Sequence, residues 1–269
     1  VIKEFEERTG WNVRVETGSA KEMLSQLEKE EADWDVAFGV SADALEEGKE
    51  YWQTGKDAWT GYSAVSFVIL YNTNVVTYRE LPTGWDSLLE PRWKGRVAVP
   101  DPLKSDLAAS VLTEAAKNSE KEEFLDLLAE NMQYQMPETF KEVEQGISDG
   151  RYSIGVTSEE AAKAMLAAGQ DVDYIDPEEG ECFFEDGTAI RKRTPNLDAS
   201  EAFVTYTTCD DTKWLLRTQL LRQPAEDVAA ENDRSDEDLK QRYSRQQEVL
   251  NIWKLIMEEK SGSAHEQEQ

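Results

Sequence analysis

Apolar residues along this chain follow two different periods. Residues 11–16 alternate apolar and polar side chains, as a half-buried strand does, whereas residues 20–30 space their apolar side chains along one helix face. The change of period falls at Gly18, and a second strand-like run, residues 35–38, is also followed by a glycine. The pattern therefore predicts strands that end at glycine turns and lead into helices.

The same succession continues to the end of the chain. Further strands are expected at residues 63–71, 96–99, 152–156, 172–175 and 188–191. Helices are expected at residues 85–89, 105–117, 120–131, 137–149, 158–168 and over most of the chain after 196, the last at 236–259. Repeated strand, turn, Ser or Thr cap and helix predict an α/β fold with largely parallel sheets. In such folds ligands bind beyond the carboxyl ends of the strands, where the helices begin.

The charge of the chain is strongly negative and narrows the classes of function. Its 269 residues include 56 acidic and 29 basic side chains, so the formal net charge is −27 at pH 7. A protein that binds nucleic acid by displacing counterions needs a basic surface, and the sequence has no Lys- or Arg-rich segment. The same negative charge disfavours an anionic membrane surface. We therefore expect no nucleic-acid partner.

No segment of the sequence has the character of a membrane span or a signal peptide. The longest apolar run, residues 64–71, is far shorter than the roughly 20 residues that cross a bilayer as a helix. Residues 1–8 have an amphipathic helical pattern with no strand before them, so we expect the natural protein to extend upstream of Val1. The polar tail, residues 260–269, is expected to be disordered.

The two cysteines give little information. Cys182 and Cys209 are too few for a disulfide framework, and they lack the paired spacing of a zinc site. We expect two ordinary small residues, while a single bridge between them in an oxidising compartment stays open.

Two segments in the middle of the chain are specific enough to suggest a family. They are GYSAVSFVILYNTNVV at residues 61–76 and LPTGWDSLLEPRWKGRVAVPDP at residues 81–102. Together they resemble the extracellular solute-binding proteins of ABC importers, in the group that contains ferric-ion, aminoethylphosphonate, thiamine and sugar-phosphate binders. The resemblance continues in order at residues 1–10, 33–45, 149–165, 174–192 and 196–209.

This resemblance implies a type II periplasmic-binding fold, in which two α/β lobes joined by two crossing segments close over a ligand in the cleft between them. The crossings are expected near residues 65–70 and 188–192, and the family's first strand is missing from this sequence. Lobe one would contain residues 1–68 and 190–269, and lobe two would contain residues 69–189.

The resemblance also implies a function. A monomeric extracytoplasmic protein, in the periplasm or on the cell surface as a lipoprotein, would capture a small molecule or ion and deliver it to an ABC transporter permease. The alternative that we keep is the ligand-sensing domain of a receptor or regulator with the same fold. We do not expect an enzyme, because the only histidine, His265, lies in the polar tail and the sequence has no phosphate-binding glycine loop.

Three turns of lobe one are candidate ligand contacts. The first two come before helices, whose unpaired starting N–H groups can hold a ligand oxygen. The third comes immediately before the crossing strand, and the resemblance implies that this position reaches the cleft. The first turn carries Ser19 and Glu22 at the spacing of a capping box. The alternative for the turns at residues 18–19 and 39–41 is that they only reverse the direction of the chain. For the third turn, the alternative is that Tyr62 is a wedge between the lobes. The candidates are Gly18, Ser19, Gly39, Ser41, Tyr62 and Ser63.

On lobe two the candidate turns follow two strands. The family has a Ser-Gly pair where this chain has Ser105 and Asp106, and that aspartate would repel an anion from the same helix start. Ferric-binding members have a tyrosine pair where this chain has Glu159 and Glu160. A capping box between Thr157 and Glu160 is the simpler interpretation, so we predict neither a metal site nor a cofactor. The candidates are Asp101, Ser105, Thr157, Ser158, Glu159 and Glu160.

Carboxylates outnumber bases among the residues expected near the ligand. The acids are Asp101, Asp106, Glu159, Glu160 and Glu185, and the bases are Lys21 and Lys104. This balance favours a cationic or zwitterionic ligand, or a metal, over a phosphate, and Tyr62 or Trp59 could stack on such a cation. In relatives the loop that contains Glu185 can border the ligand, but the simpler interpretation, which we prefer, is that its acids stay solvated.

Overall fold

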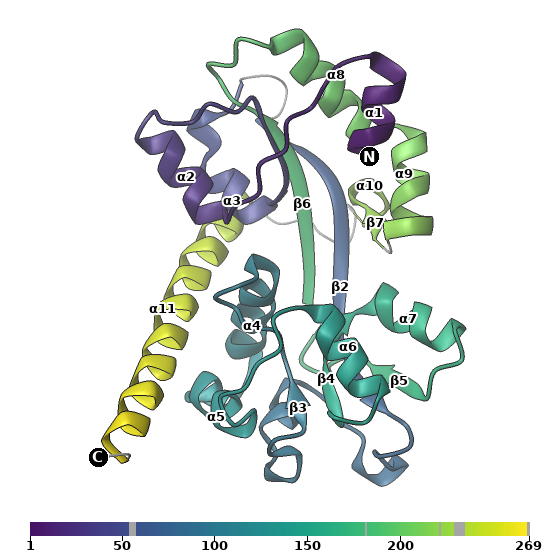
Figure 1. The fold of residues 1–269 in the computed structure, drawn as a ribbon, viewed down its shortest axis with the longest axis vertical. Coiled ribbons are helices and arrows are strands. Elements are labelled where there is room, and N and C mark those ends of the chain that lie inside the picture. The colour runs from purple at the N-terminus through teal and green to yellow at the C-terminus, as the bar shows by residue number, and fades with distance from the viewer. Residues whose placement is uncertain (54–57, 181, 221, 229–234, 268–269) are drawn as a thin grey trace. The chain divides into compact units, whose positions relative to one another are not determined.

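The computed structural model describes the chain except for residues 54–57, 181, 221, 229–234 and 268–269. The chain divides into two compact units, each with its own helices and strands (Figure 1). Unit 1 contains Val1–Val65 and Phe184–Tyr243, and unit 2 contains Ser66–Phe183 and Ser244–Gln269. Within the described ranges, none of the helices combines the length and apolar character that crossing a membrane requires.

Three elements carry the chain from one unit into the other. They are strand β2 (Thr60–Asn72), strand β6 (Cys182–Ile190) and helix α11 (Asp236–Gln267). The sequence suggests a second crossing at residues 188–192, whereas the structure places it between Phe183 and Phe184, because β6 starts well before the expected strand. The sequence also assigns residues 244–269 to lobe one, whereas the structure groups them with unit 2.

Unit 1 consists of a small sheet with helices around it. In this unit β6 lies between β1 and β2, and β7 pairs with the start of β2, with Ser63 opposite Pro224. Besides the shared elements, unit 1 contains α1 (Ile2–Thr9), α2 (Ala20–Glu28), β1 (Val36–Ser41), α3 (Ala42–Glu47), the 3-10 helix Lys49–Tyr51, α8 (Leu197–Thr207), α9 (Asp210–Leu215), the π-helix Leu216–Leu220, β7 (Gln223–Pro224) and α10 (Ala225–Val228).

Unit 2 is built on the second half of β2. In this unit β4 lies between β2 and β3, and β5 also pairs with β2. Besides the shared elements, unit 2 contains the 3-10 helices Tyr78–Glu80, Trp85–Leu89 and Pro91–Trp93, followed by β3 (Val97–Ala98), α4 (Asp106–Asn118), α5 (Phe124–Asn131), α6 (Phe140–Ser148), β4 (Ile154–Ser158), α7 (Glu159–Ala167) and β5 (Val172–Ile175).

The α/β class is as the sequence predicts, but the expectation of largely parallel sheets is wrong. The pairings of β1 with β6, and of β2 with β4, β5 and β7, are antiparallel. Among the pairings given for the described strands, that of β3 with β4 is parallel. The reason is that β2, a strand of 13 residues, pairs with three strands that run back along it, which the local pattern of each strand does not show.

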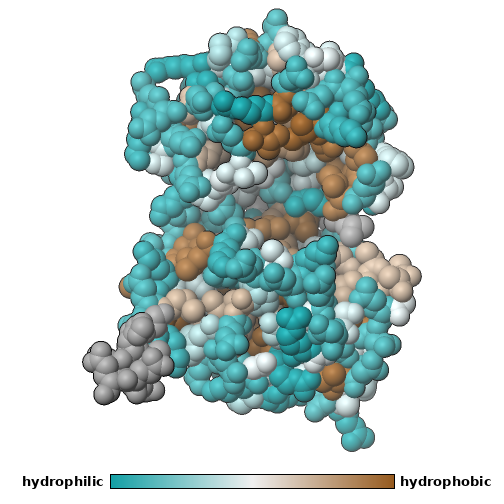
Figure 2. All heavy atoms as spheres, in the orientation of Figure 1, coloured by the Kyte–Doolittle hydropathy of each residue, from teal (hydrophilic) through white to brown (hydrophobic). Residues whose placement is uncertain are grey.

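Each unit has its own apolar core. In unit 1, Phe5 of α1 packs edge-to-face on Phe203 of α8, with ring centroids 5.1 Å apart, while Leu24 and Leu45 join α2 to α3. In unit 2, Val143 and its neighbours cover the sheet from α6 and α7. Hydrophilic residues dominate the visible face of both units (Figure 2), as the charged fraction of 32% leads one to expect.

Helix α11 packs on each unit with a different part of its length. In unit 1, Lys49 forms a 2.6 Å ion pair with Asp236 at the start of the helix. In unit 2, the Gln246 side chain donates hydrogen bonds to the Asp106 carbonyl oxygen and to Ser110 Oγ, at 2.9 and 2.8 Å. The helix continues to Gln267, where the sequence suggests a disordered tail, and residues 268–269 lie outside the described part.

Two other expectations meet the structure differently. Residues 11–16 form no strand, because no described strand pairs with them, and the side chains of Trp11 and Val15 are largely exposed. Cys182 is buried and Cys209 is partly exposed, and no disulfide joins them.

Candidate functional site

The first candidate turn in unit 1 is the start of α2. Ser19 Oγ accepts a hydrogen bond from the Glu22 N–H at 3.2 Å, and Glu22 Oε2 accepts one from the Ser19 N–H at 3.0 Å. The predicted capping box is therefore confirmed. Gly18 immediately precedes this cap, and a Cβ there would lie 3.1 Å from the Glu22 carboxylate, so the turn is closed on its own side chains.

The second candidate turn belongs to the end of β1. The sequence predicts that this strand ends before Gly39. In the structure it continues to Ser41, with an irregular register between Phe38 and Val40. Gly39 has a φ of +66°, a left-handed conformation that glycine adopts without the steric cost of a side chain, so this bulge explains the glycine. Ser41 caps α3 by accepting a hydrogen bond from the Ala44 N–H at 3.4 Å.

Tyr62 and Ser63 lie inside β2, which begins at Thr60, and not in a turn before it. The Tyr62 ring packs on Phe38 with ring centroids 4.7 Å apart. Burial raises the pKa of the Tyr62 hydroxyl to about 12, so this group stays protonated at neutral pH. Ser63 is completely buried, and its hydroxyl has no hydrogen-bond partner.

Three ionisable side chains lie close to this part of β2. Asp186 of β6 forms an ion pair with Arg222, the residue before β7. Burial raises the pKa of Asp186, and the charge and hydrogen bond of Arg222 oppose that shift. Burial, together with the neighbouring Asp186, raises the pKa of Glu185 to about 7. At neutral pH Glu185 is thus present in both protonation states.

The candidate turns of unit 2 meet at one edge of its sheet. Strands β3 and β4 are parallel, with Ala98 opposite Gly155, so the residues that follow both strands lie at the same edge. Asp101 Oδ1 accepts a hydrogen bond from the Leu103 N–H at 3.0 Å, which fixes the turn after β3. Ser105 then caps α4 by accepting from the Ala108 N–H at 3.2 Å, as the sequence predicts.

The turn after β4 differs from the sequence-based expectation. The N-cap of α7 is Ser158, which accepts from the Ala161 N–H at 3.2 Å, so the predicted capping box between Thr157 and Glu160 is wrong. Thr157 is completely buried and donates its hydroxyl hydrogen to Glu144 Oε1 at 2.7 Å. The reason is that Thr157 is still part of β4, so its side chain points to α6 and not to the start of the next helix.

The two glutamates at the start of α7 have different surroundings. Glu159 forms a 2.6 Å ion pair with Lys163 one turn later and accepts a 3.5 Å hydrogen bond from the Tyr174 hydroxyl. Glu160 is partly buried on the first turn of the helix. Within the described ranges, no three His, Cys, Asp or Glu side chains are grouped as a metal ion would require.

The structure thus brings together subsets of the predicted residues. In unit 2, Asp101, Ser105 and the 157–160 turn share one sheet edge, whereas in unit 1 β1 and Tyr62 meet through the contact with Phe38. Sequence reasoning missed Glu144 and Arg222. Neither gives a local signal, because Glu144 lies inside an amphipathic helix and Arg222 finds Asp186 only through a pairing 36 residues distant in sequence.

Known proteins resemble this chain in sequence and in fold. Iron uptake protein A1 of Synechocystis sp. is 23% identical over 262 residues, which cover 85% of this chain and 69% of that protein. The ferric binding protein from Campylobacter jejuni superimposes with a TM-score of 0.75 at 17% identity, covering 95% and 94% of the two chains. A structure described as a two-component system protein that mediates signal transduction gives 0.67 at 20% identity, covering 88% and 86%.

These similarities define the class first: the fold is that of the type II periplasmic-binding proteins, as expected from the sequence. The sequence then defines the family. Residues 21–247 match the profile of the bacterial extracellular solute-binding proteins, and the chain belongs to that family. The prediction of a solute-binding protein is confirmed.

Proposed function

We propose that this chain is the extracytoplasmic component of an ABC importer, which captures a small solute reversibly and delivers it to the membrane permease. The family match over residues 21–247 carries this proposal. Capture and release change no covalent bond, so the protein acts without catalysis. It would act as a monomer, in the periplasm or on the cell surface. Solute binding would favour one conformation of the protein, and the permease would recognise that conformation.

The proposed solute is cationic or zwitterionic. The net charge of −27 and the carboxylates among the candidate contacts support a positively charged ligand. Ferric ion is one solute to test, because relatives are named for iron uptake and for ferric binding. In place of the tyrosine pair of ferric binders this chain has Glu159 and Glu160, and Glu159 is already paired with Lys163.

The test begins with native mass spectrometry of protein purified without unfolding, followed by calorimetric titration with ferric citrate, thiamine, choline and glycerol 3-phosphate. We expect a retained small molecule or ion, and binding of thiamine, choline or the ferric ion that the citrate complex supplies, without binding of glycerol 3-phosphate. Binding of the phosphorylated compound alone would show that the assigned charge is wrong. Absence of any retained or bound solute would contradict solute capture itself.

The contact residues are part of the proposal, and each unit is to be tested by itself. For unit 2, Asp101→Asn and Glu160→Gln should weaken binding of the identified solute by about tenfold, the usual effect of losing a charged contact. Exposed Glu178, changed to Gln, is the matched control. Unchanged affinity in both variants would show that Asp101 and Glu160 do not contact the solute. The proposed contacts are Gly18, Ser19, Gly39, Ser41, Tyr62 and Ser63 in unit 1, and Asp101, Ser105, Thr157, Ser158, Glu159 and Glu160 in unit 2.

A ligand-sensing domain is the second candidate function, because a protein described as part of a two-component system has a similar fold. The two functions differ in what deletion of the gene does in the organism of origin. Loss of uptake of the radiolabelled solute supports the importer component. Normal uptake together with loss of the transcriptional response to the solute supports the sensor.

A further inference from the structure

The side chain of Glu185 has no partner within unit 1 among the described residues. It lies on β6, partly buried, and forms no hydrogen bond or ion pair with the described part of the chain. A carboxylate removed from water without a partner is costly, and its raised pKa, about 7, reflects that cost. Partly buried carboxylates of this kind are concentrated at functional sites.

The fold provides space for this carboxylate by placing a glycine opposite it. A Cβ at Gly61 of β2 would overlap Oε1 of Glu185 and would lie 3.0 Å from the Cβ of Ala225. The carboxylate therefore lies on the face of β2 to which a side chain at position 61 would point. Any larger residue at this position would displace Glu185.

A second unsatisfied polar group lies on the same face of β2. Side chains two residues apart in a strand point to the same side, so Ser63 lies on the face that Gly61 and Glu185 share. Ser63 is fully buried and its hydroxyl has no hydrogen-bond partner. Buried hydroxyls in native proteins almost always have a partner, so this one indicates a ligand or a water that completes the site.

The charged groups on the surrounding elements are already paired. Arg222 is paired with Asp186, which is the neighbour of Glu185 on β6. On α10, Glu226 forms a 2.7 Å ion pair with Lys213, and Asp227 a 2.6 Å ion pair with Arg217. Tyr62 of β2 stays neutral, and Arg242, whose guanidinium lies over the Phe184 ring of β6, forms a 3.7 Å ion pair with Asp43. Among these described groups, no cation is left to compensate the charge of Glu185.

We propose that Glu185 is the residue of unit 1 that binds the positively charged group of the solute, with the Ser63 hydroxyl as a further acceptor nearby. This proposal rests on the proposed solute-binding function and adds a specific contact to it. A cation placed here compensates a carboxylate that the protein itself leaves unpaired. The interaction is stronger than at an exposed carboxylate, because the surroundings of Glu185 are partly removed from water.

The proposal has a pH signature. A cation binds the ionised form of Glu185, so below the pKa of the free protein, about 7, binding must release a proton. The affinity for a cation should then fall by about tenfold for each pH unit below 7 and stay constant above it. A contact that does not titrate would show no such dependence.

The test is calorimetric titration of the full chain at pH 5, 6, 7 and 8 with choline, putrescine, spermidine and thiamine, each of which keeps a positive charge over this range. Wild-type protein should bind at least one of them and show the pH dependence. Glu185→Gln should weaken that binding by about tenfold or more at pH 8 and remove the pH dependence. Ser63→Ala should weaken it by a smaller factor.

The matched control is Glu201→Gln, an exposed position of α8 in the same unit. Glu185→Gln should melt at the wild-type temperature at pH 5, where the wild-type carboxyl is protonated, which shows that the variant folds. Equal affinity of wild type and Glu185→Gln, or no binding of any of the four cations, overturns the proposal. A solute found by native mass spectrometry in either case leaves the proposed function intact, so the two failures are distinguishable.

Discussion

The hydroxyl groups of the candidate turns in unit 2 have hydrogen-bond partners within the protein, whereas two polar side chains on the adjoining strands of unit 1 do not. In unit 2, Ser105 and Ser158 each accept the N–H of a helix that they cap, and Thr157 donates to Glu144. In unit 1, Ser63 and Glu185 have no partner within the described residues. Ser63 is a candidate contact on sequence just as Ser105 and Ser158 are, and the structure separates them, whereas for Glu185 the sequence favours a solvated carboxylate.

This difference indicates how a ligand contact can be distinguished from a structural residue. A capping serine is explained by its own helix, because the cap satisfies an N–H group that has no partner inside the helix. A buried hydroxyl or carboxylate without a partner is not explained by the fold. The predictions below therefore compare satisfied and unsatisfied positions.

The largest expected effect compares two glycines that face different neighbours. A Cβ at Gly155 in unit 2 would lie 2.6 Å from the Ala98 carbonyl oxygen and 2.8 Å from Val143 Cγ1, and neither backbone nor core can move aside. Gly155→Ala should lower the free energy of unfolding by about 3 kcal/mol. At Gly61 the overlapping group is the end of the flexible Glu185 side chain, so Gly61→Ala should lower it by about 1 kcal/mol. Urea denaturation at pH 8 measures both.

Removing the opposing side chain provides the control. Glu185→Ala combined with Gly61→Ala should recover most of the loss, since the added methyl group then takes vacated space. No second substitution relieves Gly155→Ala, because its nearest neighbour is a backbone oxygen. Equal losses at the two glycines, or no recovery in the double variant, would show that Glu185 does not lie against Gly61.

The next effect is the dependence of stability on pH. The pKa of Glu185 is about 7 in the folded protein, above its ordinary value of 4.5, so the folded state binds more protons than the unfolded state between these values. The contribution of Glu185 to stability is therefore fully present below pH 4.5 and is lost as the pH rises through 7. Allowing for partial exposure, the contribution of this group is about 1–2 kcal/mol. Urea denaturation from pH 4.5 to 8 should give a flatter profile for Glu185→Gln than for wild type, and parallel profiles would refute the assignment.

The sequence predicts those parts of the fold that depend on local chemistry. Ser19 and Ser105 are N-caps, as predicted, because a hydroxyl and an N–H three residues later suffice to form the cap. The strand at 11–16 fails for the opposite reason. Alternation shows that a segment suits a strand, but a strand also needs a partner, and pairing is a non-local property.

The same limit applies to the candidate residues. Thr157 looks like a capping residue in the sequence, but β4 extends two residues further than expected, to Ser158, and the Thr157 hydroxyl donates to Glu144. The lack of a partner at Glu185 cannot be found from sequence, because it depends on Arg222 being paired with Asp186 and on Gly61 of another strand. The sequence shows a glycine at position 61, but it does not show that the Glu185 side chain occupies the space of a side chain there.

A smaller effect on stability distinguishes a hydroxyl that has a hydrogen-bond partner from one that has none. Ser158→Ala removes the cap of α7 and should lower the free energy of unfolding by about 1 kcal/mol. Ser63→Ala removes a buried hydroxyl that has no partner, so it should leave the stability unchanged or raise it slightly. Thermal and urea denaturation of the ligand-free protein check both. If Ser63→Ala is the more destabilising variant, its hydroxyl has a structural role and not a binding one.

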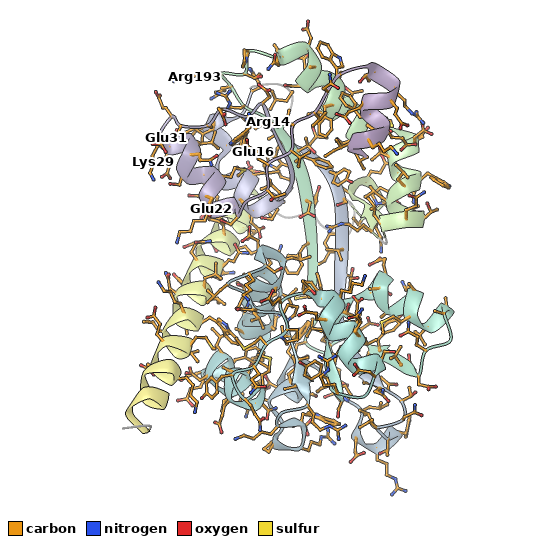
Figure 3. All side chains as sticks on the ribbon, viewed as in Figure 1. Arg14, Glu16, Glu22, Lys29, Glu31 and Arg193 are labelled. Carbon is orange, nitrogen blue, oxygen red and sulfur yellow. The ribbon has the colours of Figure 1, made fainter. Side chains whose placement is uncertain are left out.

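The smallest expected effect concerns the exposed ion pairs of unit 1, where charges are partnered but solvated. Arg14 lies on the segment between α1 and α2, and Arg193 follows β6 (Figure 3); they pair with Glu16 at 2.9 Å and Glu30 at 2.8 Å. All four side chains are more than half exposed, so Arg14→Ala and Arg193→Ala should each change the free energy of unfolding by less than about 0.5 kcal/mol. Neither should change the pH profile that Glu185 produces. A loss above about 1 kcal/mol in either variant would mean that ion pairing, and not burial, determines how much a carboxylate contributes to the stability of this unit.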